Sequence, residues 1–265
     1  MCKECGCGLG GDVKIGGHDH DHGHEHGHDH HHESDHDHGH GRQTVTLQRS
    51  LLEKNDRLAE QNRGFFRAKK LLVLNVVSSP GSGKTTFIRE TAAKLAGRLR
   101  VGVIVGDLAT DNDAARLRTA GIPVVQITTG TVCHLDSEMV SKAAGQLDLE
   151  KLDVLVIENV GNLVCPADYD LGEDLRVVLL SVTEGEDKPL KYPPMFHSAH
   201  VAVVTKSDMA AAAGFDRDLA LANLNRVSHH ARIFELSSKT GEGMKAWLDF
   251  LVEQRTAVKS GKKQN

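Results

Sequence analysis

The chain has no apolar run long enough to cross a bilayer, and its first thirty residues have no apolar segment of the signal-peptide kind. These absences exclude a membrane-spanning or secreted protein and predict a cytoplasmic one. A basic surplus is also missing, since 32 Lys and Arg face 36 Asp and Glu, which argues against nucleic-acid binding. The five cysteines are an odd number, which favours thiolate metal ligands over disulfides in a reducing compartment.

Histidine is concentrated at one end of the chain. Twelve of the 17 histidines lie in residues 1–41, together with 2 basic and 9 acidic side chains. This segment has too few large aliphatic side chains to fold alone, so we expect a disordered, metal-binding arm over 1–41. The other 224 of the 265 residues can form a full hydrophobic core. We expect a helical segment over 42–70, the main domain over 71–257 and a polar tail over 258–265.

Short apolar runs alternate with amphipathic stretches from residue 71 onward. This alternation predicts an α/β fold with a mainly parallel sheet flanked by helices on both faces. The expected strands are 71–77, 101–105, 124–127, 153–160, 176–182, 200–205 and 231–236. The expected helices are 44–70, 84–97, 111–120, 134–146, 216–228 and 242–256.

The segment SSPGSGKTT, which begins at Ser78, lies between the first of these strands and a helix. Gly81 and Gly83 let successive backbone amides point at phosphate oxygens, and the helix directs its positive end at the same anion. Lys84 can reach the β- and γ-phosphates, and the Thr85 hydroxyl can ligate Mg²⁺. The order of these parts predicts a P-loop nucleotide hydrolase rather than a glycine-rich turn without a ligand. Ser78 stands where glycine is usual, and serine fits if its φ angle is negative. The residues expected to hold the phosphates are Gly81, Ser82, Gly83, Lys84, Thr85 and Thr86.

Two carboxylates follow later strands, Asp107 after VGVIVG and Glu158 within VIENVG. Ligands gather at the carboxyl ends of parallel strands, so both should face the nucleotide. We expect Asp107 to hold Mg²⁺ with Thr85, directly or through water. Glu158 begins an acidic-x-x-Gly segment in which the backbone of Gly161 is expected to sense the γ-phosphate. The predicted catalytic side chains are therefore Lys84, Asp107 and Glu158.

The stretch DLATDNDAAR that begins at Asp107 is rich in small and acidic residues and is typical of a switch loop. Asp111 or Asp113 could position the attacking water, and the sequence does not choose between them. A helix cap or a solvated side chain is an equally good interpretation of each.

The segment TKSD, which ends at Asp208, follows another expected strand and predicts guanine as the base. An aspartate there accepts both hydrogens of the N1 and N2 edge of guanine, a donor pair that adenine lacks, and the stem of Lys206 can cover the ring. Thr205 stands where asparagine is more usual, which leaves guanine preferred but not exclusive. A chance Lys-x-Asp in a turn is the alternative. A second segment, ELSSKTGEG, is suited to donate backbone N–H groups to the guanine oxygen. Its contacting residues are expected to be Ser237, Ser238 and Lys239.

Two metal-binding patterns lie in the amino-terminal arm. MCKECGC brings three thiols together on a short glycine-containing loop, which suits a soft or borderline divalent ion, unless they are simply unstructured reactive cysteines. The histidine tract, interleaved with Asp, Glu and Gly, can wrap several Ni, Zn, Cu or Co ions and fits storage. The charge of imidazole changes near pH 6.5, so ions should be released on acidification. The cysteines are Cys2, Cys5 and Cys7, and the histidines are His18, His20, His22, His24, His26, His28, His30, His31, His32, His36, His38 and His40.

A third pattern combines Cys133 and His134, at the expected start of a helix, with Cys165 after ENVGNLV. Three ligands are one short of the four that Zn²⁺ usually takes, so the site is open to water, a transferable ion or a second subunit. Cys165 lies four residues after Gly161. We therefore expect nucleotide state and metal affinity to be coupled through residues 158–165. The alternative is two buried cysteines and an incidental histidine.

Together, MCKECGC, the histidine tract, SSPGSGKTT, GDLATDNDAAR, TVCHLD, ENVGNLVCPADYDLGE, TKSD and SSKTGEGM resemble the HypB family, GTPases that help to insert nickel into [NiFe]-hydrogenase. The similarity spans nearly the whole chain, and CHLD and ENVGNLVCP are its most specific parts. It implies slow GTP hydrolysis, a GTP-dependent homodimer, a nickel or zinc site of Cys133, His134 and Cys165 near the dimer interface, and a tight nickel site in the amino-terminal cysteine motif. The implied partners are a HypA-type nickel/zinc maturation protein and the hydrogenase large-subunit precursor.

We therefore expect a GTP-hydrolysing metallochaperone that stores nickel and delivers it to that precursor, with metal affinity and dimerisation coupled to the nucleotide. Its expected cofactors are GTP/GDP, Mg²⁺, Ni²⁺ and Zn²⁺. No arginine finger can be named, so intrinsic turnover should be slow. A urease-type nickel GTPase is one alternative, although its Cys-Pro-His motif differs from the adjacent Cys133 and His134. A nickel or zinc storage protein with vestigial GTPase activity is the other.

Overall fold

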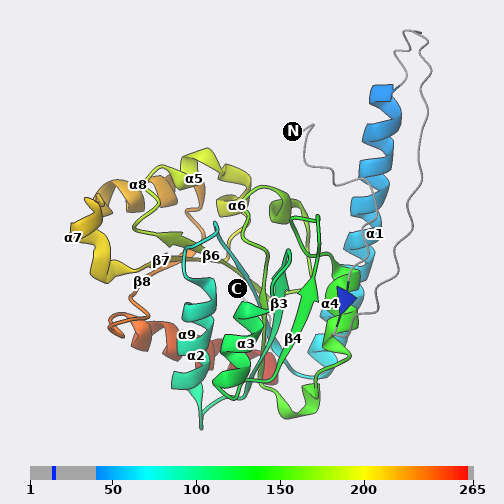
Figure 1. The fold of residues 1–265 in the computed structure, drawn as a ribbon, viewed down its shortest axis with the longest axis horizontal. Coiled ribbons are helices and arrows are strands. Elements are labelled where there is room, and N and C mark those ends of the chain that lie inside the picture. The colour runs from blue at the N-terminus through cyan, green and yellow to red at the C-terminus, as the bar shows by residue number, and fades with distance from the viewer. Residues whose placement is uncertain (1–13, 16–39, 262–265) are drawn as a thin grey trace, which may run out of the picture.

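The computed structural model describes residues 14–15 and 40–261 (Figure 1). The amino-terminal cysteine motif therefore lies outside the described residues. So does the histidine tract, apart from the backbone of His40. Among the residues that the structure describes, no helix combines the length and the apolar character needed to cross a membrane.

The core is one sheet whose strands follow the spatial order β1-β4-β3-β5-β2-β6-β7-β8. Strands β2 to β8 are parallel, and the two-residue β1 pairs antiparallel with β4. The prediction of a mainly parallel sheet with flanking helices is confirmed, whereas β1 lies in the arm for which no strand was expected. The strands are β1 (Lys14–Ile15), β2 (Leu72–Val77), β3 (Val101–Asp107), β4 (Val124–Thr128), β5 (Val154–Glu158), β6 (Leu175–Ser181), β7 (Val201–Thr205) and β8 (Arg232–Glu235).

Helices cover both faces of this sheet (Figure 1). The inner strands are buried on both sides, which explains their continuous apolar sequences. Helices α2, α3 and α9 contribute to the core on one face, and α1 and α4 to a core on the other. The helices are α1 (His40–Ala68), α2 (Lys84–Leu95), α3 (Asn112–Thr119), α4 (Ser137–Ala144), α5 (Lys188–Lys191), α6 (Pro193–His197), α7 (Ala210–Ala213), α8 (Arg217–Val227) and α9 (Met244–Lys259), with 3₁₀ turns η1 (Leu149–Lys151), η2 (Cys165–Asp168) and η3 (Ser207–Met209).

Strand β2 is central, and its carboxyl end runs into the P-loop. It pairs directly with β5, so that Val76 lies opposite Glu158. Strand β3 is the neighbour of β5 and does not touch β2. This order places the end of β5 closer to the P-loop than the end of β3.

The helix expected over 134–146 starts later than predicted, at Ser137. Asp136 is its N-cap, and the Asp136 side chain accepts a hydrogen bond from the Met139 amide at 2.8 Å. An aspartate cap satisfies an amide that the helix itself leaves unpaired, and so fixes where the helix begins. Cys133 and His134 consequently lie in the preceding loop.

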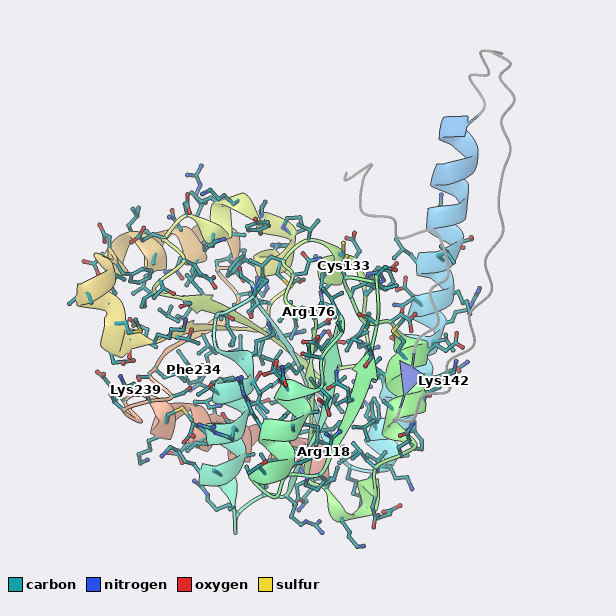
Figure 2. All side chains as sticks on the ribbon, viewed as in Figure 1. Arg118, Cys133, Lys142, Arg176, Phe234 and Lys239 are labelled. Carbon is teal, nitrogen blue, oxygen red and sulfur yellow. The ribbon has the colours of Figure 1, made fainter. Side chains whose placement is uncertain are left out.

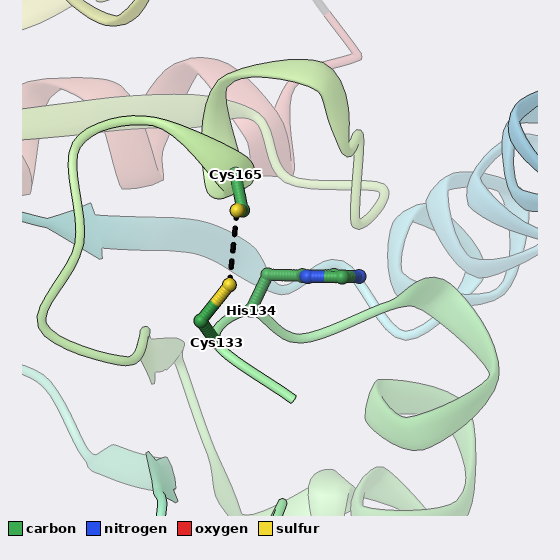
Figure 3. A group of neighbouring side chains, drawn as sticks. All are labelled: Cys133, His134 and Cys165. Atoms are coloured by element: carbon green, nitrogen blue, oxygen red, sulfur yellow. Dashed lines mark hydrogen bonds between the residues drawn. The ribbon is translucent and has the colours of Figure 1, made fainter. Parts of the chain in front are cut away.

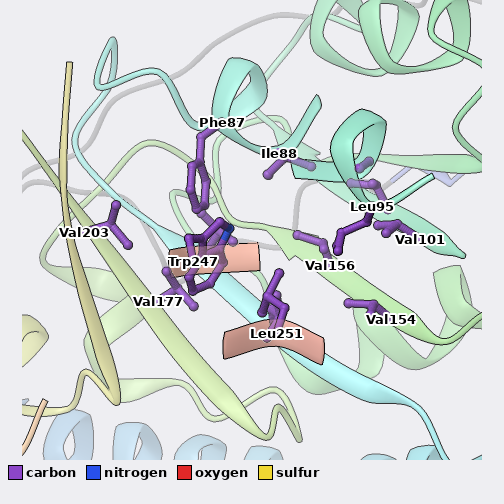
Figure 4. Close-up of a cluster of buried hydrophobic side chains, with 14 of the residues drawn as sticks. Phe87, Ile88, Leu95, Val101, Val154, Val156, Val177, Val203, Trp247 and Leu251 are labelled. Carbon is purple, nitrogen blue, oxygen red and sulfur yellow. The ribbon is translucent and has the colours of Figure 1, made fainter. Parts of the chain in front are cut away.

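Replacing Trp247 with alanine is expected to lower the free energy of unfolding by about 3–5 kcal/mol. The side chain is fully buried, and its ring centroid lies 5.3 Å from that of Phe87 and 5.9 Å from that of Phe250 (Figure 4). Its Nε1 donates to the Thr91 hydroxyl at 3.1 Å, so the variant leaves both a cavity and an unpaired buried hydroxyl. Urea unfolding followed by circular dichroism measures the change. Leu219→Ala, at a half-exposed position, is the control, and equal losses in the two variants would contradict the prediction.

Candidate functional site

The P-loop has the backbone geometry that its glycines were expected to provide. Gly81 has a φ of 75° and Gly83 a φ of 97°, a left-handed conformation that glycine adopts without strain. Gly83 is also the N-cap of α2, whose amino-terminal amides face the loop. Among the described non-glycine residues, Lys70 and Lys206 are the ones with positive φ. The Ser78 backbone therefore does not need glycine.

Hydroxyl groups line the inside of this loop. The Lys84 ammonium donates to the Ser78 hydroxyl at 3.0 Å, and the Ser82 hydroxyl also donates to Ser78. Burial lowers the pKa of Lys84, and the negative charge of Glu158 opposes that shift. The loop thus directs a cation and several polar groups at the position where phosphates bind in P-loop proteins.

The Thr85 hydroxyl donates to the Glu158 carboxylate at 2.7 Å. Glu158 is 3 % exposed, and its second oxygen, Oε2, is buried without a hydrogen-bond partner. Burial raises the pKa of Glu158 to about 7, although the hydrogen bond from Thr85 and the charge of Lys84 lower it. A hydroxyl and a carboxylate with a spare oxygen are hard ligands that suit Mg²⁺.

The acidic residues of the switch loop lie in different surroundings. Asp107 accepts hydrogen bonds from the amides of Ala109 and Thr110 at 3.0 and 3.1 Å, so its carboxylate shapes the loop. Asp111 is the N-cap of α3 and lies 3.6 Å from Arg118. The charges of Asp113 and Asp107 both raise the pKa of buried Glu158. The structure therefore places Glu158, rather than Asp107, on Thr85, with Asp107 and Asp113 near that carboxylate.

Replacing Glu158 with glutamine is expected to flatten the pH dependence of unfolding without nucleotide or Mg²⁺. Folding raises the pKa of this carboxyl from 4.5 to about 7. Its contribution to stability is therefore full below pH 4.5 and is lost as the pH rises through 7, by on the order of 3 kcal/mol. Urea unfolding at pH 5 and pH 8 measures this loss, with Glu253→Gln as the exposed control. A parallel loss in the parent and the Glu158 variant would disprove the assignment.

The TKSD segment, which is predicted to bind the guanine base, also hydrogen-bonds to the P-loop. Lys206 has a φ of 60°, and its ammonium donates to the Gly81 carbonyl at 2.8 Å. The Thr205 hydroxyl donates to the Ser82 carbonyl at 3.1 Å. Thr205, which replaces the more usual asparagine, thus contributes a contact to the phosphate-binding loop.

The two predicted guanine segments meet in the fold. The Ser237 hydroxyl donates to the Asp208 carboxylate at 2.6 Å and accepts from the Lys239 amide at 3.2 Å. Ser237 is fully buried, whereas Ser238 is half-buried and Lys239 exposed. The loop after β8 therefore holds Asp208 in place beside the P-loop.

Cys133, His134 and Cys165 converge on one point (Figure 3). The two Sγ atoms lie 2.9 Å apart, longer than the roughly 2.05 Å of a disulfide, and the three ligand atoms lie within 4.8 Å of one another. His134 is 7 % exposed, and its buried Nδ1 has no hydrogen-bond partner. Burial lowers the pKa of His134, which favours the neutral form that binds metal ions. This donor set fits Ni²⁺ or Zn²⁺.

Sequence reasoning missed Tyr169, which forms one wall of this site. Its ring stacks on that of His134 with 3.9 Å between centroids. Tyr169 directly follows the turn η2, which begins at Cys165. The loop that carries Cys165 therefore packs against the loop that carries Cys133 and His134 through a ring contact. We refer to these two candidate metal-site loops as the metal-bearing loops.

Helix α1, whose carboxyl-terminal half lies beside α4 in Figure 1, contacts the chain just after each of these two loops. Asn55 donates to the Asp170 carbonyl at 2.8 Å and accepts from the Ser137 amide at 2.9 Å. Asn62 donates to the carbonyls of Ser137 and Leu171. Two buried asparagines seven residues apart lie on one helix face, and this spacing is the signal from which the contact could have been predicted.

Gly161 lies directly on the P-loop. A Cβ atom at this position would lie 3.1 Å from both Cα and Cγ of Pro80. The chain then continues to Cys165 four residues later. The segment that packs on the P-loop and the Cys165 thiol are therefore consecutive parts of one loop.

Comparisons with known proteins agree with this geometry. Residues 72–235 match the family described as "CobW/HypB/UreG, nucleotide-binding domain". The hydrogenase maturation factor HypB of Escherichia coli (strain K12) is 50 % identical over 216 residues, which cover 82 % of this chain and 74 % of that protein. The hydrogenase/urease maturation factor HypB of Helicobacter pylori is 41 % identical, with 81 % and 89 % covered.

Two solved structures have the same fold. HypB from Helicobacter pylori in complex with nickel has a TM-score of 0.74 at 41 % identity, covering 80 % of this chain and 98 % of that one. HypB from Archaeoglobus fulgidus has a TM-score of 0.72 at 39 % identity, with 77 % and 99 % covered. The chain therefore belongs to the CobW/HypB/UreG family of nucleotide-binding proteins, within its HypB branch of hydrogenase maturation factors.

Proposed function

We propose that this protein hydrolyses GTP and uses the nucleotide state to control delivery of nickel to the [NiFe]-hydrogenase large-subunit precursor. The observation that carries the proposal is the path of residues 158–165. This segment begins at the carboxylate that accepts from Thr85, passes over Pro80 and ends at the thiol of Cys165. Similarity to HypB solved with nickel supports Ni²⁺ as the cargo, and relatives named hydrogenase maturation factors support the destination.

GTP binds to the P-loop in this proposal. Backbone amides of the loop hold the phosphates, and the Lys84 ammonium offsets the negative charge that develops on the γ-phosphate. Thr85 and Glu158 would hold Mg²⁺, with Asp107 contributing through water, and the bound ion would supply positive charge against the phosphates. Asp113 positions the attacking water. Among the described residues, no arginine is hydrogen-bonded to the P-loop, so we expect slow turnover to GDP and phosphate.

The base is guanine. The Asp208 carboxylate accepts from its N1 and N2 edge, and the Lys206 stem covers the ring. The amides of Ser238 and Lys239 donate to the guanine oxygen. Because Ser237 already holds Asp208, the carboxylate is oriented before the nucleotide arrives.

The nickel site is open on one side. Two thiolates and one neutral imidazole supply three ligands. The fourth comes from a water molecule, from a protein that exchanges nickel or zinc with this chain, or from a second copy of the chain. Val164, next to Cys165, is 52 % exposed, and Leu108 of the switch loop is 42 % exposed. A GTP-dependent homodimer that closes over the metal, as the similarity to HypB implies, would cover these two side chains.

The remaining parts of the proposal concern storage and partners. Cys2, Cys5 and Cys7 form a second, tight nickel site, and the histidine tract stores further ions. A HypA-type nickel/zinc maturation protein exchanges metal with this chain, and the whole process takes place in the cytoplasm.

The test compares Ni²⁺ affinity at the Cys133 site with GDP and with a non-hydrolysable GTP analogue, alongside the molar mass in solution. We expect a different affinity in each nucleotide state and a dimer with the GTP analogue. Equal affinities would overturn the coupling. Absence of any GTP turnover would instead favour the storage protein with a vestigial GTPase.

A second destination has one observation in its favour. The Helicobacter pylori relative is named a hydrogenase/urease maturation factor. Nickel transfer to purified precursors of both enzymes distinguishes the two destinations, and transfer to the urease precursor alone would overturn the hydrogenase proposal.

A further inference from the structure

Four buried polar side chains lie between the P-loop and the metal site and have no part in the mechanism described above. Buried polar and charged groups are costly unless they are hydrogen-bonded, so the partners of each side chain show what the cluster holds together. The residues are Asn75, Asn159, Glu173 and Arg176, exposed by 0 %, 1 %, 6 % and 6 %.

Asn159 makes the first link. It directly follows Glu158, the carboxylate on Thr85. Its Oδ1 accepts from the amide of Leu135 at 3.3 Å, and Leu135 directly follows His134. One side chain therefore joins the end of β5 to the loop that carries the metal histidine.

Asn75 makes the second link. It lies on β2, three residues before Ser78 and the P-loop. Its Oδ1 accepts from Asn159 Nδ2 at 3.2 Å, and its own Nδ2 donates to the Glu173 carboxylate at 3.1 Å. The strand that ends in the P-loop is thus bonded to both of its polar neighbours.

Arg176 makes the third link. Its Nε donates to Glu173 at 3.0 Å, and its two terminal nitrogens donate to the carbonyls of Ala167 at 3.0 Å and Tyr169 at 2.8 Å. These carbonyls belong to the turn η2 and its end, which carry Cys165 and the ring on His134. Figure 2 labels Arg176 and Cys133 among the surrounding side chains.

We propose that these four residues position the two metal-bearing loops against the P-loop and pass the nucleotide state to the metal site. This inference rests on the proposed function. Hydrogen bonds in a low-dielectric interior are directional and strong, so a shift at the end of β2 or β5 is shared with both loops. A buried ion pair such as Glu173–Arg176 often stabilises a core less than apolar side chains of the same size would. This fits a positioning role rather than a stabilising one.

The test uses the full chain with Cys2, Cys5 and Cys7 replaced by alanine. The sulfur-to-nickel charge-transfer absorption then reports on Cys133 and Cys165. Ni²⁺ alone is titrated with GDP and with a non-hydrolysable GTP analogue. The ratio of the two dissociation constants measures the coupling, which we expect to be about fivefold or more in this parent. The histidine tract competes equally in both states, so it cancels from the ratio.

Asn159→Ala and Asn75→Ala cut different bonds of the cluster. Asn159→Ala removes the bonds to Leu135 and Asn75, and Asn75→Ala removes those to Asn159 and Glu173. Each is expected to lower the ratio by about twofold or more, while the continuous segment 158–165 keeps part of the coupling. Asn223→Ala is the matched control. Asn223 lies on α8, is also buried at 8 % exposed, and donates to the Glu186 carbonyl just before α5. It should retain the parent ratio.

The outcomes separate the two proposals. A parent ratio of one overturns the nucleotide coupling itself. A coupled parent together with an unchanged ratio in either folded asparagine variant overturns the role of the four residues. Circular dichroism identifies a variant that fails to fold, and the other asparagine variant then decides.

Discussion

Replacing Lys84 with alanine is expected to lower GTP turnover by about 10²–10³-fold, the loss typical when one group that stabilises transition-state charge is removed. The ammonium is held inside the P-loop by Ser78 and lies near Glu158, so no other described cation has its position. Phosphate release under single-turnover conditions measures the effect at saturating nucleotide.

Lys94→Ala provides the matched control, because Lys94 is an exposed lysine on the same helix α2. It should leave turnover within about twofold of the parent. A Lys84 variant that keeps more than about a tenth of the parent rate would show that the lysine does not act on the γ-phosphate.

Replacing Cys165 with serine is expected to lower Ni²⁺ affinity at the Cys133 site by more than about 100-fold. Loss of a residue that only supports a ligand costs about 10–100-fold, and loss of a thiolate ligand should cost more. Serine keeps the shape of the side chain but supplies a poor ligand for this ion. In the background without Cys2, Cys5 and Cys7, the loss of sulfur-to-nickel absorption measures the change.

Asp218→Asn is the control for Cys165, since its side chain is exposed on α8. It should bind Ni²⁺ with nearly the parent affinity. Undiminished absorption in the serine variant would mean that Cys165 does not bind the ion.

Local patterns were sufficient to predict the P-loop. The glycines, Lys84 and Thr85 act within one turn of backbone, so their arrangement follows from a short stretch of sequence. Local patterns did not predict that Glu158, rather than Asp107, would accept the hydrogen bond from Thr85. Both end strands at the same edge, but only the spatial order shows that β5 is next to β2 and β3 is not.

The buried polar cluster was also beyond local reasoning. Asn75 lies within the apolar run LLVLNVV, and its partners Asn159 and Glu173 are 84 and 98 residues away along the chain. The same holds for Asn55 and Asn62 on α1, whose partners are Ser137 at the start of α4 and Asp170 and Leu171 after η2. Periodicity predicts which side of an element faces inward but not which distant loop it meets.

Helix α1 separates the end of the histidine tract from the loops of Cys133 and Cys165 by a fixed length. Its 29 residues begin at His40, and Asn55 donates to the Asp170 carbonyl just after η2. At about 1.5 Å per residue, the end of the histidine tract is thereby tethered roughly 20 Å from that contact. In the storage role that we propose for this tract, the length of α1 would set the local concentration of its ions at Cys133 and Cys165.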